Sequence, residues 1–189
     1  MAALLTAADL PAHSAFISID TSRNNSIDVR ELQASLDRTS PGQFTLPVVS
    51  LLIRLFDEDG SGDISWAEFR TLYSLLNAWL ELYRHELAAA GGHTLPGAFL
   101  APRLEALWVP AYLGLTAEEV AAAPIAALLE SHLKATIVGV DNITFGALAK
   151  VMAQVHAVKR LAAMSDPAGA GSFVLNRSQL LRYVMLASC

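Results

Sequence analysis

Apolar residues recur every three or four positions along most of the chain, and two short polar stretches interrupt this pattern near its start. Leu52, Ile53 and Phe56 precede the second polar stretch, and a long apolar stripe follows it. This spacing predicts amphipathic helices on both sides of a polar loop. The stripe consists of Phe69, Leu72, Tyr73, Leu76, Leu80, Tyr83 and Leu87. Because the stripe is unbroken to its end, we expect a helix too long to belong to a single helix-loop-helix unit.

The second polar stretch, DEDGSGDISWAE at residues 57–68, places oxygen-bearing side chains at alternate positions. Calcium loops of twelve residues use side chains at positions 1, 3 and 5, a backbone carbonyl at 7, a group acting through water at 9 and a bidentate glutamate at 12. Gly62 at position 6 suits the tight turn. The stretch predicts a Ca²⁺ site, because Mg²⁺ requires stricter octahedral geometry. The residues at these positions are Asp57, Asp59, Ser61, Asp63, Ser65 and Glu68.

An earlier stretch, DTSRNNSIDVRE at residues 20–31, repeats this arrangement after the apolar residues Phe16 and Ile19. Asn25 replaces the glycine at position 6, and asparagine tolerates a positive φ angle. We expect Ile27 and Ile64, at position 8 of the two loops, to pair in a short β-bridge. This loop has fewer carboxylates at its ligand positions, so weaker Ca²⁺ binding is expected. Its six ligand candidates are Asp20, Ser22, Asn24, Ser26, Asp28 and Glu31.

Three further helix-loop-helix units are predicted at intervals of about 30 residues, and none is expected to hold calcium. The turn region of the third contains Gly91, Gly92, Thr94 and Leu95. The fourth loop is expected to start near Thr136, with Asn142, Ile143 and Thr144 at positions 7 to 9, and the fifth at Asp166. We interpret these units as packing elements, because their ligand positions are poor. Those positions hold Val138, Val140 and Ala147 in the fourth loop, and Ala168, Ala170 and Arg177 in the fifth.

Five such units, with long helices shared between units two and three and between four and five, resemble the penta-EF-hand family, which includes the calpain small subunit, sorcin and grancalcin. The resemblance rests on FDEDGSGDISWAEF, LYSLLNAW and FVLNRSQLLRYVML and spans nearly the whole chain. It implies an all-α fold in one domain, residues 1–189, with short β-bridges between paired loops. The units are expected near residues 9–40, 47–80, 70–108, 118–160 and 147–189.

Three departures from the family pattern are visible. The glycine- and proline-rich N-terminal extension common in the family is missing, so target and membrane binding through that region is not expected from this sequence. The third loop lacks usable ligands, although family members often bind calcium there. The stretch around residues 102–116, between the third and fourth loops, is about a dozen residues longer than the pattern predicts.

Composition restricts the function further. The chain is 53% hydrophobic and 16% charged, with a mean hydropathy of +0.41, which favours burial of apolar surface against another chain. No uninterrupted apolar stretch is long enough for a membrane span, no secretory signal is recognised, and the single cysteine, Cys189, fits a reducing compartment such as the cytoplasm. The net charge of −5 gives no support for nucleic-acid binding.

No enzymatic function is expected. His85 and Glu86 begin a sequence that lacks the second histidine of a metalloprotease helix, because position 89 is Ala89. The chain also has no phosphate-binding glycine loop and no nucleophile elbow.

The resemblance implies a calcium sensor or adaptor that pairs through its fifth unit, residues Asp166 to Cys189, with a second copy or another penta-EF-hand chain. Calcium would draw Glu31 and Glu68 inward and uncover apolar surface for protein targets, with peripheral membrane association as a further expectation. Two bound Ca²⁺ would change the formal charge from −5 to −5 + 4 = −1, which reduces repulsion. The alternative is a constitutive subunit, of a calpain-like protease or a cytoskeletal assembly, in which calcium only stabilises the fold.

Overall fold

The computed structural model describes residues 9–114 and 135–165, with side chains described as far as residue 160. Contacts divide the chain into two compact parts, an N-terminal part, Met1–Glu81, and a C-terminal part, Leu82–Cys189. The division falls inside one long helix, α4 (Trp66–Ala89), which confirms the expected long helix after the second loop.

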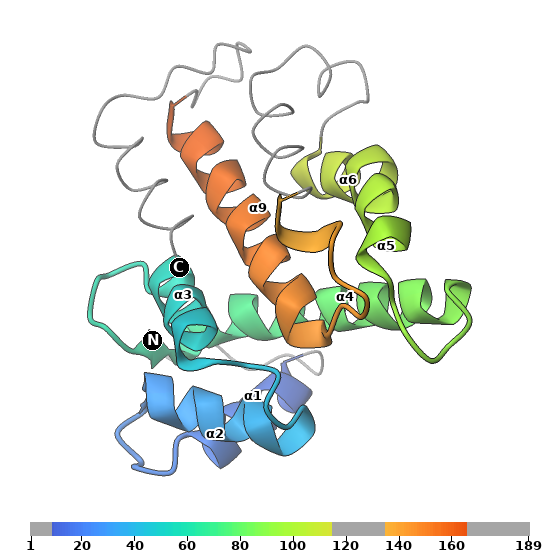
Figure 1. The fold of residues 1–189 in the computed structure, drawn as a ribbon. Coiled ribbons are helices and arrows are strands. Elements are labelled where there is room, and N and C mark those ends of the chain that lie inside the picture. Colours follow the sequence, from blue (N-terminus) through green and yellow to red (C-terminus); the bar gives the residue numbers. More distant parts are fainter. Residues whose placement is uncertain (1–8, 115–134, 166–189) are drawn as a thin grey trace. The chain divides into compact units, whose positions relative to one another are not determined.

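The N-terminal part contains two helix-loop-helix units (Figure 1). The first consists of α1 (Leu10–Ile19) and α2 (Val29–Thr39), and the second of α3 (Leu46–Phe56) and the beginning of α4. Between them the strands β1 (Ser26–Ile27) and β2 (Ile64–Ser65) pair in antiparallel orientation, with Ile27 opposite Ile64. The expected β-bridge at position 8 is therefore confirmed.

Local sequence explains where these helices begin and end. The Asp28 side chain accepts hydrogen bonds from the N–H groups of Arg30 and Glu31, and the Glu31 side chain accepts one from the N–H of Asp28. This reciprocal capping box fixes the first turn of α2. Pro11 and Pro47 lie in the first turns of α1 and α3, where a missing N–H costs nothing. Helix boundaries and loop boundaries thus coincide.

The core of the N-terminal part consists of the apolar residues that flank the loops. Both bridge isoleucines are fully buried, and so are the apolar residues on either side of the loops that the sequence pattern indicated. A few methylene-rich side chains of this kind contribute about 1.5–3 kcal/mol each when buried. These flanking residues are Phe16, Ile19, Leu52, Ile53, Phe56, Phe69 and Leu72.

Further along α4 the buried face differs from the expected stripe. Trp79, Leu82 and Glu86 are buried, whereas Leu80, Tyr83 and Leu87 are only half-buried. Residues seven apart on an α-helix lie within about 20° of one face, so the face of Leu72 continues through positions 79 and 86. The stripe thus predicted the helix, and the fully buried face beyond Leu72 runs beside the later stripe residues.

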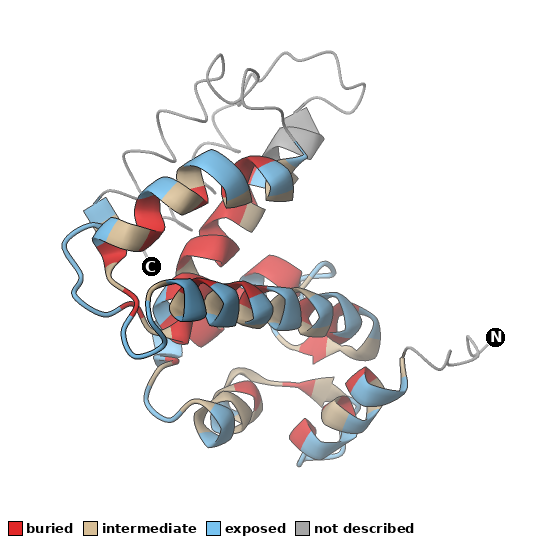
Figure 2. Cartoon of the chain, turned by 90° about the vertical axis from the view of Figure 1, so that its right-hand side faces the viewer, coloured by how far each residue is buried: buried red, intermediate tan, exposed pale blue. Residues whose placement is uncertain are grey.

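The C-terminal part begins with the end of α4 and continues through α5 (Gly97–Arg103), the π-helix η1 (Leu104–Trp108), α6 (Val109–Leu113) and, later, α9 (Phe145–Ser165). The longer stretch noticed after residue 102 is helical as far as Leu113. Most residues of α9 up to Val158 are buried (Figure 2), including Phe145, Leu148, Met152 and Val155 of the predicted apolar face.

The third and fourth loops pair in the C-terminal part, although they have no strands. The N–H of Ile143 donates to the carbonyl of Leu95 at 2.7 Å, and the N–H of Leu95 donates to Oδ1 of Asn142 at 3.0 Å. The N–H of Gly97 donates to the carbonyl of Val140 at 2.8 Å. The predicted positions of Leu95 and Ile143 as loop centres are therefore confirmed, and the fold is all-α with a short β-bridge.

Predicted features at residues 115–134 and from 166 onwards, including the fifth loop and the last helix, lie outside the described residues. None of the described helices is both long and apolar enough to span a membrane.

Candidate metal centre

The two polar loops of the N-terminal part share one hydrogen-bond pattern. At position 1 of the second loop, the Asp57 carboxylate accepts the N–H groups of Gly60, Ser61 and Gly62 at 2.8, 3.0 and 2.9 Å. At position 1 of the first loop, the Asp20 carboxylate accepts the N–H groups at positions 5 and 6 at 3.1 and 2.9 Å. Each loop is thus wound around its first aspartate.

Positions 4 and 6 of both loops have left-handed backbone conformations. The φ angles are 60° and 63° at Arg23 and Asn25, and 75° and 91° at Gly60 and Gly62. The expectation that Asn25 replaces glycine at a positive φ is confirmed. The similar conformation at position 4 was not foreseen, although Gly60 in the second loop is a signal for it. Arg23 carries this conformation with a β-carbon, at a cost of about 1–2 kcal/mol.

The glutamates at position 12 already reach across their loops. Glu68, 8% exposed, accepts the Glu58 N–H at 2.7 Å through Oε1, and the Ser65 N–H and hydroxyl at 2.8 and 2.7 Å through Oε2. Glu31 accepts the N–H groups of Ser22 and Asp28 at 2.9 and 3.1 Å. Glu31 and Glu68 therefore have the inward position that the sequence analysis expected for the calcium-bound loops. Backbone N–H groups hold both carboxylates there.

Hydrogen bonds keep the loop carboxyl groups ionised. Burial raises the pKa of Glu68, but hydrogen bonds from Ser65 and from the Glu58 N–H outweigh it, so the pKa lies below its ordinary value. The pKa of Glu31 is likewise lowered, with burial outweighed by the N–H groups of Ser22 and Asp28. Ser61 lowers the pKa of Asp59 through its hydroxyl and N–H. These three groups carry the charge that a cation requires.

The second loop brings three carboxylates together. One oxygen each from Asp57, Asp59 and Glu68 lies within 4.8 Å of the others, the one such group among the described residues. The Ser61 hydroxyl donates to the Asp63 carbonyl at 3.1 Å, so the oxygens of positions 5 and 7 are adjacent. Carboxylate, hydroxyl and carbonyl oxygens are the donors that Ca²⁺ prefers, and the residues present fit this ion.

The first loop offers less negative charge. Residues 20–31 contain three acidic side chains and the two arginines Arg23 and Arg30, whereas residues 57–68 contain five acidic side chains and no basic one. The Asp28 carboxylate accepts the N–H groups of Arg30 and Glu31 at 2.8 Å each and so caps α2. Cation affinity rises with ligand charge. The difference in charge therefore supports the prediction that the first loop binds Ca²⁺ more weakly than the second.

A hydroxyl group links the two loops. Ser26 Oγ lies 3.1 Å from Oδ1 of Asn24 in its own loop and 3.3 Å from Oδ2 of Asp63 in the other loop. A serine hydroxyl has one hydrogen, so it donates to one of these acceptors at a time. Asn24 and Asp63 belong to positions 5 and 7 of the two candidate sites, which are therefore in direct contact.

An indole ring lies at position 10 of the second loop. Trp66 packs edge-on against His13 and Phe16 of α1, with ring centroids 5.0 and 5.6 Å apart. The first helix of one unit thus contacts the loop of the other. Trp66 also provides an optical reporter beside the candidate site.

Comparison with known proteins agrees with this geometry. Residues 11–74 match the family described as the EF-hand domain pair. Sorcin from Schistosoma japonicum is 30% identical over 69 residues, which is 36% of this chain and 40% of that protein. The chain therefore matches less than half the length of this relative.

Residues 11–74 form an EF-hand domain pair. The carboxylate group of the second loop is consistent with Ca²⁺ binding by this pair. A solved structure described as a homolog of programmed cell death 6 protein from Leishmania major Friedlin is similar over 93% of both chains, with a TM-score of 0.54 and 19% identity. At this identity the similarity concerns the fold alone.

Proposed function

We propose that this chain is a penta-EF-hand protein and a calcium sensor that binds Ca²⁺ in the loops of residues 20–31 and 57–68. The observation that carries the proposal is the convergence of the carboxylates of Asp57, Asp59 and Glu68 in a loop that is hydrogen-bonded to a second loop of the same design. The ligands would be the side chains at positions 1, 3, 5 and 12, the carbonyl at 7 and position 9 through water.

Glu68 connects the loop to a helix. It accepts N–H groups from the loop at one end and belongs to the first turn of α4. Bound calcium would supply a divalent charge for the carboxylate oxygens to coordinate. Glu68 would give up its hydrogen bonds to the loop N–H groups in order to coordinate the ion. Because Glu68 belongs to the first turn of α4, its movement would shift this helix. Glu31 would act in the same way on α2, and the Ser26 hydroxyl would couple the two sites.

The experiment that tests the sites is titration with Tb³⁺ under excitation of Trp66. Sensitised emission is expected, and Glu68→Gln should weaken binding roughly 10- to 100-fold because the bidentate carboxylate is lost. Glu31→Gln should leave most of the Trp66-sensitised emission intact, because Trp66 belongs to the second loop.

Glu58→Gln is the matched control. It removes the same charge from the same loop, at position 2, where no side-chain ligand is expected. If Glu58→Gln and Glu68→Gln weaken Tb³⁺ binding equally, the effect comes from net charge and the proposed ligand set is wrong.

The alternative is a constitutive subunit in which calcium stabilises the fold without switching it. In this alternative, Glu31 and Glu68 would keep the positions inside their loops that the structure shows. A sensor should gain hydrophobic-probe binding as calcium crosses roughly 10⁻⁷ to 10⁻⁵ M. A constitutive subunit should only gain stability, about 2.7 kcal/mol per site at 100 times Kd, with unchanged probe binding.

Further parts of the proposal concern assembly. An odd number of units leaves one unit without an internal partner, so we expect pairing through residues 166–189 with a second copy or another penta-EF-hand chain. The same proposal includes regulation of protein targets and peripheral membrane association when calcium is bound. It also includes a cytoplasmic location and the lack of an enzymatic activity. A comparison of oligomeric state for the whole chain and for a chain ending at residue 165 tests the pairing.

A further inference from the structure

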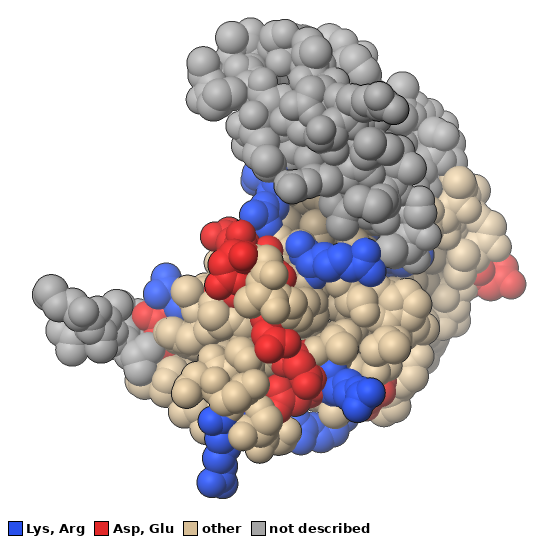
Figure 3. Space-filling model, turned by 90° about the vertical axis from the view of Figure 1, so that its left-hand side faces the viewer, with Lys and Arg blue, Asp and Glu red and all other residues tan. Residues whose placement is uncertain are grey.

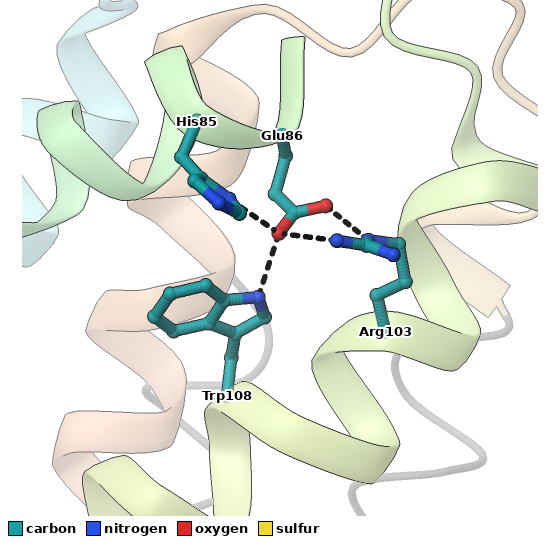
Figure 4. A network of polar contacts seen from close by, with 4 residues as sticks. All are labelled: His85, Glu86, Arg103 and Trp108. Carbon is teal, nitrogen blue, oxygen red and sulfur yellow. Dashed lines mark hydrogen bonds and ion pairs between the residues drawn. The ribbon is translucent and has the colours of Figure 1, made fainter. Parts of the chain in front are cut away.

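A buried carboxylate lies in the C-terminal part, outside the candidate calcium loops. Glu86 on α4 is 0% exposed, and donors surround its carboxylate (Figure 4). Arg103 forms an ion pair with it through Nε and Nη2, Trp108 Nε1 donates to Oε1 at 2.8 Å, and His85 Nδ1 lies 3.1 Å from Oε1. The sequence analysis considered Glu86 only as part of an incomplete metalloprotease pattern.

The pair connects the two helices of the third helix-loop-helix unit. The contact between Leu95 and Ile143 places Leu95 at position 8, so the third loop comprises residues 88–99. Glu86 lies just before this loop on α4, and Arg103 follows it on α5. In a calcium-binding unit, the ion and the glutamate at position 12 hold the exiting helix to the loop. Here position 12 is Phe99, and residues 88–99 contain no acidic side chain.

We propose that Arg103 is a built-in cation that replaces calcium in the third unit. Its guanidinium group holds α4 and α5 together through Glu86, at all calcium concentrations. Its positive charge lies over the Phe99 ring, 5.1 Å from the centroid. In a calcium-binding unit a carboxylate at position 12 coordinates the ion, whereas here an aromatic ring at position 12 packs against the Arg103 cation. The calcium response is thereby confined to the first two loops; this last consequence rests on the proposed function.

The π-helix η1 completes the cluster. Arg103 and Trp108 are five residues apart, which in an α-helix places two side chains about 140° from each other. In the wider turn of a π-helix, with hydrogen bonds between residues five apart, these positions come closer to one face. Both side chains can therefore reach the one carboxylate. The buried charge of Glu86 is compensated by hydrogen bonds on both oxygens, which a stable buried carboxylate requires.

The experiment is hydrogen–deuterium exchange of the whole chain in EDTA and in calcium. In the wild-type protein, calcium should slow exchange in residues 20–31 and 57–68 and leave residues 86–103 unchanged. Arg103→Met should accelerate exchange in residues 86–103 by about 100-fold in EDTA, since it leaves a buried carboxylate without its cation. Calcium should not reverse this acceleration. Arg84→Met, which removes an exposed arginine from α4, the helix of Glu86, is the control and should change exchange less than about threefold.

Arg103→Lys covers the case in which Arg103→Met does not fold. Lysine keeps the cation but not the paired hydrogen bonds, so exchange of residues 86–103 should lie between that of wild type and that of Arg103→Met. Calcium-dependent exchange of residues 86–103 in the wild type would overturn the proposal. So would an acceleration by Arg84→Met as large as that by the Arg103 variants. If calcium protects neither of the first two loops, the proposed sensor function fails, while the acceleration by Arg103→Met in EDTA still supports the built-in cation.

Discussion

Arg23 bears a positive φ angle of 60° at the loop position where Gly60 has a φ of 75°. A β-carbon in this conformation costs about 1–2 kcal/mol, and glycine avoids that cost. Glycine in turn loses more conformational freedom on folding, and this entropy loss cancels about 0.5–1 kcal/mol of the advantage that glycine has at this position. The first loop therefore keeps a local strain that the second loop lacks, next to its candidate ligands.

We predict that Arg23→Gly stabilises the protein by about 0.5 kcal/mol in EDTA, as the balance of these two effects. Urea unfolding in EDTA measures it, so that bound calcium does not contribute. The reciprocal variant Gly60→Arg should destabilise by about 1 kcal/mol. A less stable Arg23→Gly would contradict the assignment of strain to position 4.

At the scale of elements, the loops pair in two different ways. The first pair uses β1 and β2 with Ile27 opposite Ile64, while the second pair uses single hydrogen bonds around Leu95. Gly97 makes the second arrangement sterically feasible. A β-carbon added there would lie 1.7 Å from the carbonyl oxygen of Ile137. Gly97 is therefore required by the close approach of two backbones.

Gly97→Ala is expected to destabilise the C-terminal part by about 3 kcal/mol or more, because backbone must move to admit the methyl group. Gly139→Ala, in the fourth loop, is the matched control: it has open space around its α-carbon, and its backbone is outside the left-handed region. Its effect should stay within about 0.5 kcal/mol. Chemical denaturation of both variants measures the difference, and equal effects would refute the close-approach argument.

Element prediction succeeded where the signal was local. The two loops and the bridge isoleucines are specified within short stretches. The burial of Trp79 and Glu86 on α4 was not predicted, and Glu86 is buried beside Arg103 and Trp108, which lie further along the chain. A buried glutamate in particular has no signature in the hydrophobic pattern, which assigns charged residues to the surface.

At the scale of the whole molecule, charge is sparse. On the face shown in Figure 3, acidic side chains gather in small groups with uncharged surface between them. Eight of the 18 acidic residues belong to the two candidate calcium loops, so bound calcium would act on a large share of the negative charge. Those eight are Asp20, Asp28, Glu31, Asp57, Glu58, Asp59, Asp63 and Glu68.

Acid should destabilise the protein through His156 before the carboxylates titrate. Burial, followed by the charges of Arg160 and Lys159, lowers the pKa of His156 to about 4, and the Tyr112 hydroxyl lies 2.5 Å from its Nδ1. An unfolded chain has a histidine pKa of about 6.5. Between these values the unfolded state binds more protons, so stability falls as the pH falls from about 6.5 towards 4.

His156→Gln should therefore lose less stability between about pH 7 and pH 5 than the wild type does, as measured by urea unfolding in EDTA. The carboxyl groups with lowered pKa, including Glu86, contribute only below their ordinary value of 4.5, outside this window. His93→Gln, at an exposed histidine, is the control. An unchanged acid sensitivity in His156→Gln would show that His156 is not its source.

The calcium loops were readable from residue order alone, because ligand spacing, turn residues and helix caps act over a dozen neighbouring residues. The folded chain added what depends on distance in sequence: Glu86 meets Arg103 and Trp108 17 and 22 residues away, and Gly97 faces Ile137 across two loops. Such contacts arise only when packing brings separate segments together and removes water from between them. Short-range stereochemistry therefore indicated the candidate metal ligands, and long-range burial placed the ion pair between α4 and α5.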